Sequence, residues 1–183
     1  MYCKMRKSIK AILIILSLGL MVSGQAQQVK KITFGESRTT KNTLLTGKST
    51  EYTDSAGYGL ITIGTLEQNE KKSKKIYIAS SKPFYFSVKL PEGHYKIKLT
   101  LGGNPEGSST TVKAESRRLM FENLVTKPGK KQTKTIVVDV RTPQINDSLK
   151  IKLKPREKNY LNWDDKLTLE FCGEKPCVSA VEI

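Results

Sequence analysis

Apolar and polar residues alternate along much of the chain beyond residue 26, and this period of two argues against a helical architecture. The alternation is clearest in residues 84–90 and resumes in residues 95–101, after the turn-forming stretch Pro91-Glu92-Gly93. Successive side chains of a β-strand point to opposite faces, so each segment offers one face to a core and one to water. We expect these two segments to form a hairpin.

The same alternation recurs in residues 149–154 and 167–171. Further short strands are expected at residues 32–34, 58–63, 75–79, 110–114, 118–126, 133–140 and 178–183. Residues 41–56 are polar, lack an apolar period and are expected to form a long loop. About ten or eleven short strands separated by turn residues are typical of a sandwich or barrel. The sequence therefore predicts an all-β fold, and we expect a jelly-roll β-sandwich.

Residues 1–26 have the composition of an export signal. Basic residues precede an apolar run at residues 11–22, and Ser23 to Ala26 offers the small residues that signal peptidase reads. The run is about twelve residues long, whereas a membrane-spanning helix needs roughly twenty. We therefore expect a signal peptide at residues 1–26 and one β-sandwich domain at residues 27–183. The protein would be secreted or periplasmic and have no stable membrane anchor, with a retained anchor as the alternative.

The chain carries a formal net charge of +15. Such a charge favours acidic partners, namely nucleic acid, anionic lipid or an acidic polysaccharide. Export argues against nucleic acid as the natural partner, and an acidic pectic polysaccharide is one expected partner. The alternative is that the charge only keeps the surface soluble.

Two cysteines, Cys172 and Cys177, flank a short stretch that contains Gly173 and Pro176, residues typical of turns. In an oxidising compartment they are expected either to close a small hairpin disulfide or to remain free thiols. A metal would need further ligands, and none are near in the sequence.

The sequence contains no recognisable catalytic constellation. A serine hydrolase needs a base, usually histidine, beside its nucleophile. The chain has a single histidine, His94, whose place beside Gly93 predicts a solvated side chain. The strings G-D-S, G-x-S-x-G and H-E-x-x-H are also missing. We therefore do not expect this chain alone to catalyse a reaction.

Candidate site residues lie in two polar stretches. Trp163 is expected either to provide an aromatic surface on which a ligand packs or to pack over the edge of the sandwich itself. Asp164 and Asp165 are expected to be turn residues, or alternatively to contribute to a structural calcium site; no other cofactor is expected. Arg117 and Arg118 are consecutive, so one of them is expected to face the core and to need a buried partner.

Four segments resemble the N-terminal domain of rhamnogalacturonan acetylesterase-type SGNH (GDSL) hydrolases. They are residues 112–120 (VKAESRRLM), 140–143 (VRTP), 153–156 (LKPR) and 161–171 (LNWDDKLTLEF). The resemblance runs from about residue 32 to residue 183 and implies a galactose-binding-like β-sandwich. In that family the sandwich precedes an α/β SGNH domain that deacetylates pectic polysaccharide.

The family's catalytic block opens with G-D-S shortly after a segment like residues 178–183, and this sequence stops there. The expected function is therefore a non-catalytic module of a secreted pectin or rhamnogalacturonan acetylesterase, truncated before its C-terminal esterase domain. The alternative is a free-standing secreted glycan-binding protein. The expected contacts to sugar or to the esterase domain are Arg117, Arg141, Trp163, Asp164 and Asp165, positions to which the resemblance assigns no catalytic chemistry.

Overall fold

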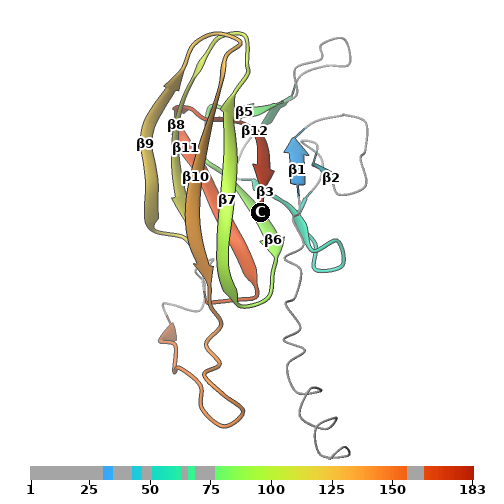
Figure 1. The fold of residues 1–183 in the computed structure, drawn as a ribbon, viewed down its shortest axis with the longest axis vertical. Helices are drawn as coiled ribbons and strands as arrows, with labels where there is room; N and C mark the ends of the chain where they lie inside the picture. Colours follow the sequence, from blue (N-terminus) through green and yellow to red (C-terminus); the bar gives the residue numbers. More distant parts are fainter. Residues whose placement is uncertain (1–30, 35–42, 47–50, 63–65, 69–76, 156–162) are drawn as a thin grey trace, which may run out of the picture.

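The computed structural model of the chain describes residues 31–34, 43–46, 51–62, 66–68, 77–155 and 163–183. These residues form strands and connections, and the described part contains no α-helix (Figure 1). The strands are β1 (Lys31–Phe34), β2 (Thr43–Thr46), β3 (Tyr58–Thr62), β4 (Leu66–Gln68), β5 (Ile78–Ser80), β6 (Phe84–Lys89), β7 (Gly93–Gly102), β8 (Ser108–Ala114), β9 (Arg118–Thr126), β10 (Lys131–Val140), β11 (Lys166–Lys175) and β12 (Cys177–Glu182).

The expected signal peptide, residues 1–26, lies outside the described residues. Within the described ranges, no helix has the length and apolarity needed to cross a membrane.

The strands form two sheets that pack face to face (Figure 1). Sheet A has seven strands in the order β10-β7-β12-β1-β2, with β5 pairing β12 and β4 pairing β5. Sheet B has five strands in the order β3-β6-β11-β8-β9. Among these pairs only β1 and β2 are parallel. From β9 to β12 each strand is followed by one in the other sheet, as in a jelly roll. The expected all-β sandwich is confirmed.

The core lies between the inward faces of the two sheets. The apolar residues that alternate in β6 and β7 are buried, namely Phe84, Phe86 and Val88 of β6 and Ile97, Leu99 and Leu101 of β7. The rings of Phe84 on β6 and Phe171 on β11 stack with their centroids 5.2 Å apart, and both side chains are fully buried. The period of two therefore identified the inward faces of these strands correctly.

The hairpin expected at residues 84–101 is wrong, although both of its strands exist. β6 belongs to sheet B and β7 to sheet A, so the turn between them carries the chain across the sandwich. An alternating segment has the same pattern whether its neighbour in sequence lies beside it or faces it across the core. The pattern alone could not distinguish the two arrangements.

Two other expected elements differ from the structure. Residues 149–154 do not form a strand, because Asn146 Oδ1 accepts hydrogen bonds from the amides of Ser148 and Leu149 and closes a local turn instead. Leu149 is consequently exposed. The expected loop at residues 41–56 contains β2, which pairs along its four residues with the edge of β1.

Cys172 and Cys177 are free thiols in this structure, so the hairpin disulfide is not formed. Cys172 lies on β11 in sheet B, whereas Cys177 lies on β12 in sheet A. The short connection between these strands passes from one sheet to the other. Hence the two side chains are not cross-strand neighbours of the kind that a hairpin disulfide joins.

Candidate interaction site at one end of the sandwich

Four connections meet at one end of the sandwich, which we call the loop end (Figure 1). They are the β6–β7 turn, the β8–β9 turn, the segment that follows β10 and the segment that precedes β11. Strand register places them together, because Gly93 of β7 pairs with Val140 of β10 and Lys89 of β6 pairs with Lys166 of β11. All five residues expected from the sequence lie in these connections: Arg117, Arg141, Trp163, Asp164 and Asp165.

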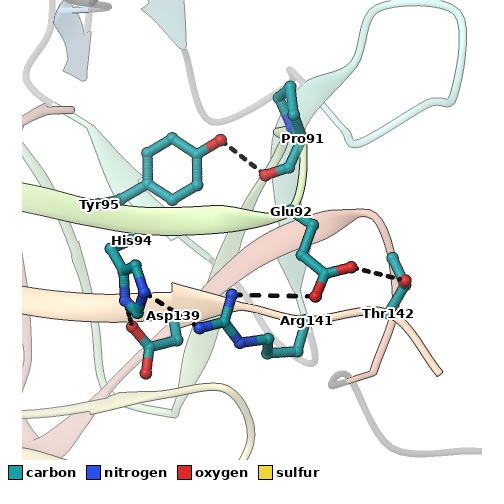
Figure 2. Close-up of polar contacts among 7 residues, drawn as sticks. All are labelled: Pro91, Glu92, His94, Tyr95, Asp139, Arg141 and Thr142. Carbon is teal, nitrogen blue, oxygen red and sulfur yellow. Dashed lines mark hydrogen bonds and ion pairs between the residues drawn. The ribbon is translucent and has the colours of Figure 1, made fainter. Parts of the chain in front are cut away.

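A chain of polar contacts runs across the ends of β7 and β10 (Figure 2). Arg141 Nη2 lies 3.2 Å from Nε2 of His94, and Nδ1 of the same ring contacts Asp139 Oδ1. A guanidinium only donates hydrogen bonds, so Nε2 accepts and Nδ1 carries the proton that faces the aspartate. The hydrogen bond from His94 lowers the pKa of Asp139, and the charges of Arg141 and Arg118 lower it further.

The same arginine ties the segment after β10 to the β6–β7 turn (Figure 2). Its Nη1 lies 3.8 Å from Oε1 of Glu92, and the Thr142 hydroxyl donates to Oε2 of Glu92 at 3.0 Å. The Tyr95 hydroxyl donates to the carbonyl oxygen of Pro91 at 2.6 Å. Both strands of sheet A at this end are thereby fixed to the turn that leads in from sheet B.

The two expected aspartates contact lysines. Asp165 Oδ2 lies 2.8 Å from Nζ of Lys89, and this hydrogen bond lowers the pKa of Asp165. Asp164 accepts a hydrogen bond from the amide of Lys166 at 3.0 Å and lies 3.1 Å from its Nζ. The described residues contain no group of three or more His, Cys, Asp or Glu side chains that could hold a metal ion. Asp164 and Asp165 thus contact lysine ammonium groups, and Asp164 also accepts from a backbone amide.

Trp163 and a short finger of chain present apolar surface at this end. Trp163 has a positive φ of 58° and is 37% exposed. The finger, residues 143–151, is held by hydrogen bonds from the amide of Ile145 to the carbonyl oxygen of Leu149 (2.9 Å) and from that of Ile151 to Pro143 (2.7 Å). Ile145 and Leu149 are 63% and 57% exposed. An ordered segment thus places two aliphatic side chains in solvent.

Arg117 and Arg118 are both exposed, so the expectation that one of them faces the core is wrong. Arg117 lies in the β8–β9 turn, which frees it from the strict alternation of a strand. The charged group held against the sheet is Glu115, whose Oε1 accepts a hydrogen bond from the amide of Thr168 at 3.0 Å. Burial raises the pKa of Glu115 to about 7, against the opposing effects of that backbone hydrogen bond and of Arg118.

Sequence reasoning missed Glu92, Asp139, Glu115 and Thr142. Of these four, Asp139 could have been identified from the sequence, because it interrupts an apolar strand. A charged residue between Val138 and Val140 must point outward or have a partner. Its partner His94 could not be identified, since the contact depends on the register of β10 against β7.

The polar side chains around His94 at the loop end contact one another. Both ring nitrogens of the chain's single histidine are engaged, one by Asp139 and one by Arg141. Neither nitrogen therefore faces a serine or threonine hydroxyl that it could activate. What remains is a set of fixed hydrogen-bonding groups beside exposed aliphatic and indole surface.

Comparison with known proteins identifies the fold but no family. No family model matches the chain, and no curated protein matches it. The crystal structure of protein YXIM from Bacillus subtilis is similar with a TM-score of 0.51 and 20% sequence identity, over 84% of this chain and 39% of that one. The crystal structure of the plant peptide RALF23 in complex with FER and LLG2 is similar with a TM-score of 0.51 and 12% identity, over 85% of this chain and 39% of that one.

The chain thus spans about two fifths of the length of each of these structures. At such low identity, the similarity extends to the β-sandwich fold and no further.

Proposed function

We propose that this chain is the non-catalytic β-sandwich module of a secreted carbohydrate acetylesterase that acts on pectin or rhamnogalacturonan. Its four segments that resemble the N-terminal domain of such SGNH hydrolases support the proposal. One of them, residues 112–120, contains the β8–β9 turn, and the described part of another, residues 163–171, contains the approach to β11 at the loop end. In this proposal, the loop end packs against the catalytic domain.

The observation that carries the proposal is the composition of the loop end. Large apolar side chains are exposed there or at the adjoining start of β9, namely Leu119, Ile145, Leu149 and Trp163. Three arginines lie at the same end: Arg117, Arg118 and Arg141. The buried centres of protein interfaces are enriched in aromatic residues and arginine, and exposed apolar surface marks interaction sites.

The engagement of His94 supports a non-catalytic role. A hydrolytic triad needs a histidine nitrogen directed at its nucleophile. Here an arginine contacts Nε2 of the only histidine in the chain. In this proposal, the serine and histidine of the reaction belong to the catalytic domain.

The coding sequence beyond codon 183 provides the first test. We expect a reading frame there, or in a neighbouring gene, that encodes a Gly-Asp-Ser block within an α/β domain. If no such frame lies nearby, the proposal fails.

The docking surface can be tested by titrating the chain with that catalytic domain in a calorimeter. We expect Ile145→Ser to weaken the association about tenfold or more, as truncation of an interface anchor does. The matched control is Val125→Ser, because Val125 is 65% exposed but lies at the far end of β9. Equal loss in both variants would place the interface elsewhere.

The second candidate is a free-standing secreted glycan-binding protein. The net charge of +15, which falls to +11 without the four basic side chains of residues 1–26, favours it. The lysines at the end of the sandwich opposite to the loop end favour it as well.

A further inference from the structure

The end of the sandwich opposite to the loop end is rich in lysine, and we call it the lysine end. It is formed by the β7–β8 loop, the β9–β10 turn with the start of β10, and the β11–β12 turn. The ten residues of β7 and of β10 separate it from the loop end by about 30 Å. It carries Lys127, Lys130, Lys131, Lys134 and Lys175.

The β7–β8 loop and the β9–β10 turn are hydrogen-bonded to each other. The amide of Gly103 donates to the carbonyl oxygen of Lys130 at 2.9 Å, and that of Gly129 donates to Asn104 at 2.7 Å. Asn104 is buried, and its Nδ2 donates to the carbonyl oxygen of Gly107 at 2.5 Å. The backbone that carries the lysines is therefore rigid, which lowers the entropy lost when a ligand binds.

Glycine is required at the point where the two turns meet. Gly102 has a φ of +82°, and a Cβ atom there would lie 2.5 Å from Oγ1 of Thr126 and 2.7 Å from the carbonyl oxygen of Lys130. Only a residue without a side chain allows this close approach.

Four lysines of the β9–β10 turn and the start of β10 form a basic surface, namely Lys127, Lys130, Lys131 and Lys134. All four are exposed, and the ion pairs found among the described residues do not involve Lys127, Lys130 or Lys134. Two acids lie at this end. Glu106 contacts Lys175 at 2.8 Å, and this hydrogen bond lowers the pKa of Glu106; Glu174 is exposed next to Lys175. These lysines thus present a positive potential to solvent, and such a potential attracts polyanions.

Uncharged hydrogen-bonding groups alternate with these lysines. The start of β10 reads Lys131-Gln-Thr-Lys-Thr135, and all five residues are exposed. Lysine supplies charge to a carboxylate, while the threonine hydroxyls donate and accept hydrogen bonds. Together they match a chain of sugars that bears both carboxylates and hydroxyls.

We infer that the lysine end binds an acidic polysaccharide through its uronate carboxylates. The composition of this end argues against a nucleic acid, because residues 102–109, 125–134 and 172–177 contain no aromatic residue to stack on bases and no arginine to hold a phosphate at two points. The inference rests on the second candidate function and gives it a location. It does not depend on the esterase module.

The test is calorimetric titration of the full chain with polygalacturonate oligosaccharides at low and at moderate salt. We expect the triple variant Lys127→Gln/Lys130→Gln/Lys134→Gln to bind about tenfold more weakly, with a smaller salt dependence. The matched control, Lys96→Gln/Lys150→Gln/Lys152→Gln, removes the same charge from exposed lysines elsewhere and should change the affinity less than about threefold. Double-stranded DNA and anionic lipid vesicles serve as alternative probes.

Each outcome is decisive. If the native chain binds none of the oligosaccharides, both the inference and the glycan-binding function fail. If both triple variants weaken binding equally, the chain binds the glycan, but its binding site is not the lysine end. Tighter binding to DNA or vesicles than to polygalacturonate would overturn the choice of partner.

Discussion

Glu115 and Thr168 are joined twice across sheet B. The amide of Thr168 donates to Oε1 of Glu115 at 3.0 Å, and the amide of Glu115 donates to the carbonyl oxygen of Thr168 at 2.9 Å. Glu115 itself has a positive φ of 50° in the β8–β9 turn. This pair of bonds holds the turn that carries Arg117 against the central strand of sheet B.

The pKa of Glu115 gives the fold a dependence on pH. Burial raises this pKa from 4.5 to about 7 in the folded chain. The stabilising contribution of the protonated group is therefore complete below pH 4.5 and is lost as the pH rises through 7. We expect Glu115→Gln, which keeps the acceptor oxygen, to be more stable than the native chain at pH 8 by about 1–2 kcal/mol and nearly equal at pH 4.5, because partial exposure reduces the full effect.

Urea unfolding at several pH values measures this difference. The matched control is Glu174→Gln, at an exposed position near the end of β11. A difference between the Glu115 variant and the native chain that stays constant from pH 4.5 to pH 8 would show that Glu115 does not titrate as proposed.

The Phe84–Phe171 stack is expected to be a main source of stability. Both rings are fully buried between the sheets. We expect Phe171→Ala to lower the free energy of unfolding by about 3–5 kcal/mol, because it removes buried apolar surface and leaves a cavity. Leu119→Ala, at a side chain that is 54% exposed, should change it by less than about 0.5 kcal/mol. Comparable losses in the two variants would contradict the assignment of the core.

The two cysteines of the sandwich should differ in reactivity. Burial and the charge of Glu170 raise the pKa of Cys172, so alkylation at pH 8 should be roughly several-fold slower than for a free thiol. Cys177 is fully buried and should react only after unfolding. Peptide mapping after alkylation measures both rates. A peptide in which Cys172 and Cys177 are linked would contradict the structure.

Alternation predicted strand positions well and strand partners poorly. The expected strand at residues 118–126 is β9, and the strand expected at residues 110–114 lies within β8. The pairing of β2 with β1 could not be anticipated, because residues 43–46 show no apolar period. The positions follow from local side-chain periodicity, whereas the partners depend on long-range packing.

For the candidate site as well, the sequence predicted the positions of residues but not their contacts. Arg117, Arg141 and Trp163 belong to segments that resemble a known domain, and the fold places them at one end of the sandwich. The contact of His94 with Asp139 joins residues 45 positions apart. It exists only in one register of β7 against β10, which the sequence of either strand leaves open.

Removal of calcium should leave the stability of the described sandwich unchanged. A calcium ion needs six to eight oxygen ligands, whereas Asp164 and Asp165 lie 3.1 Å and 2.8 Å from the ammonium groups of Lys166 and Lys89. An ion at either carboxylate would have to displace a lysine. We therefore expect excess EDTA, or added calcium chloride, to shift the melting temperature by less than about 1 °C. A larger rise with calcium that Asp164→Asn abolishes would place a metal at the loop end, whereas a rise that survives in that variant would place the ion at another site.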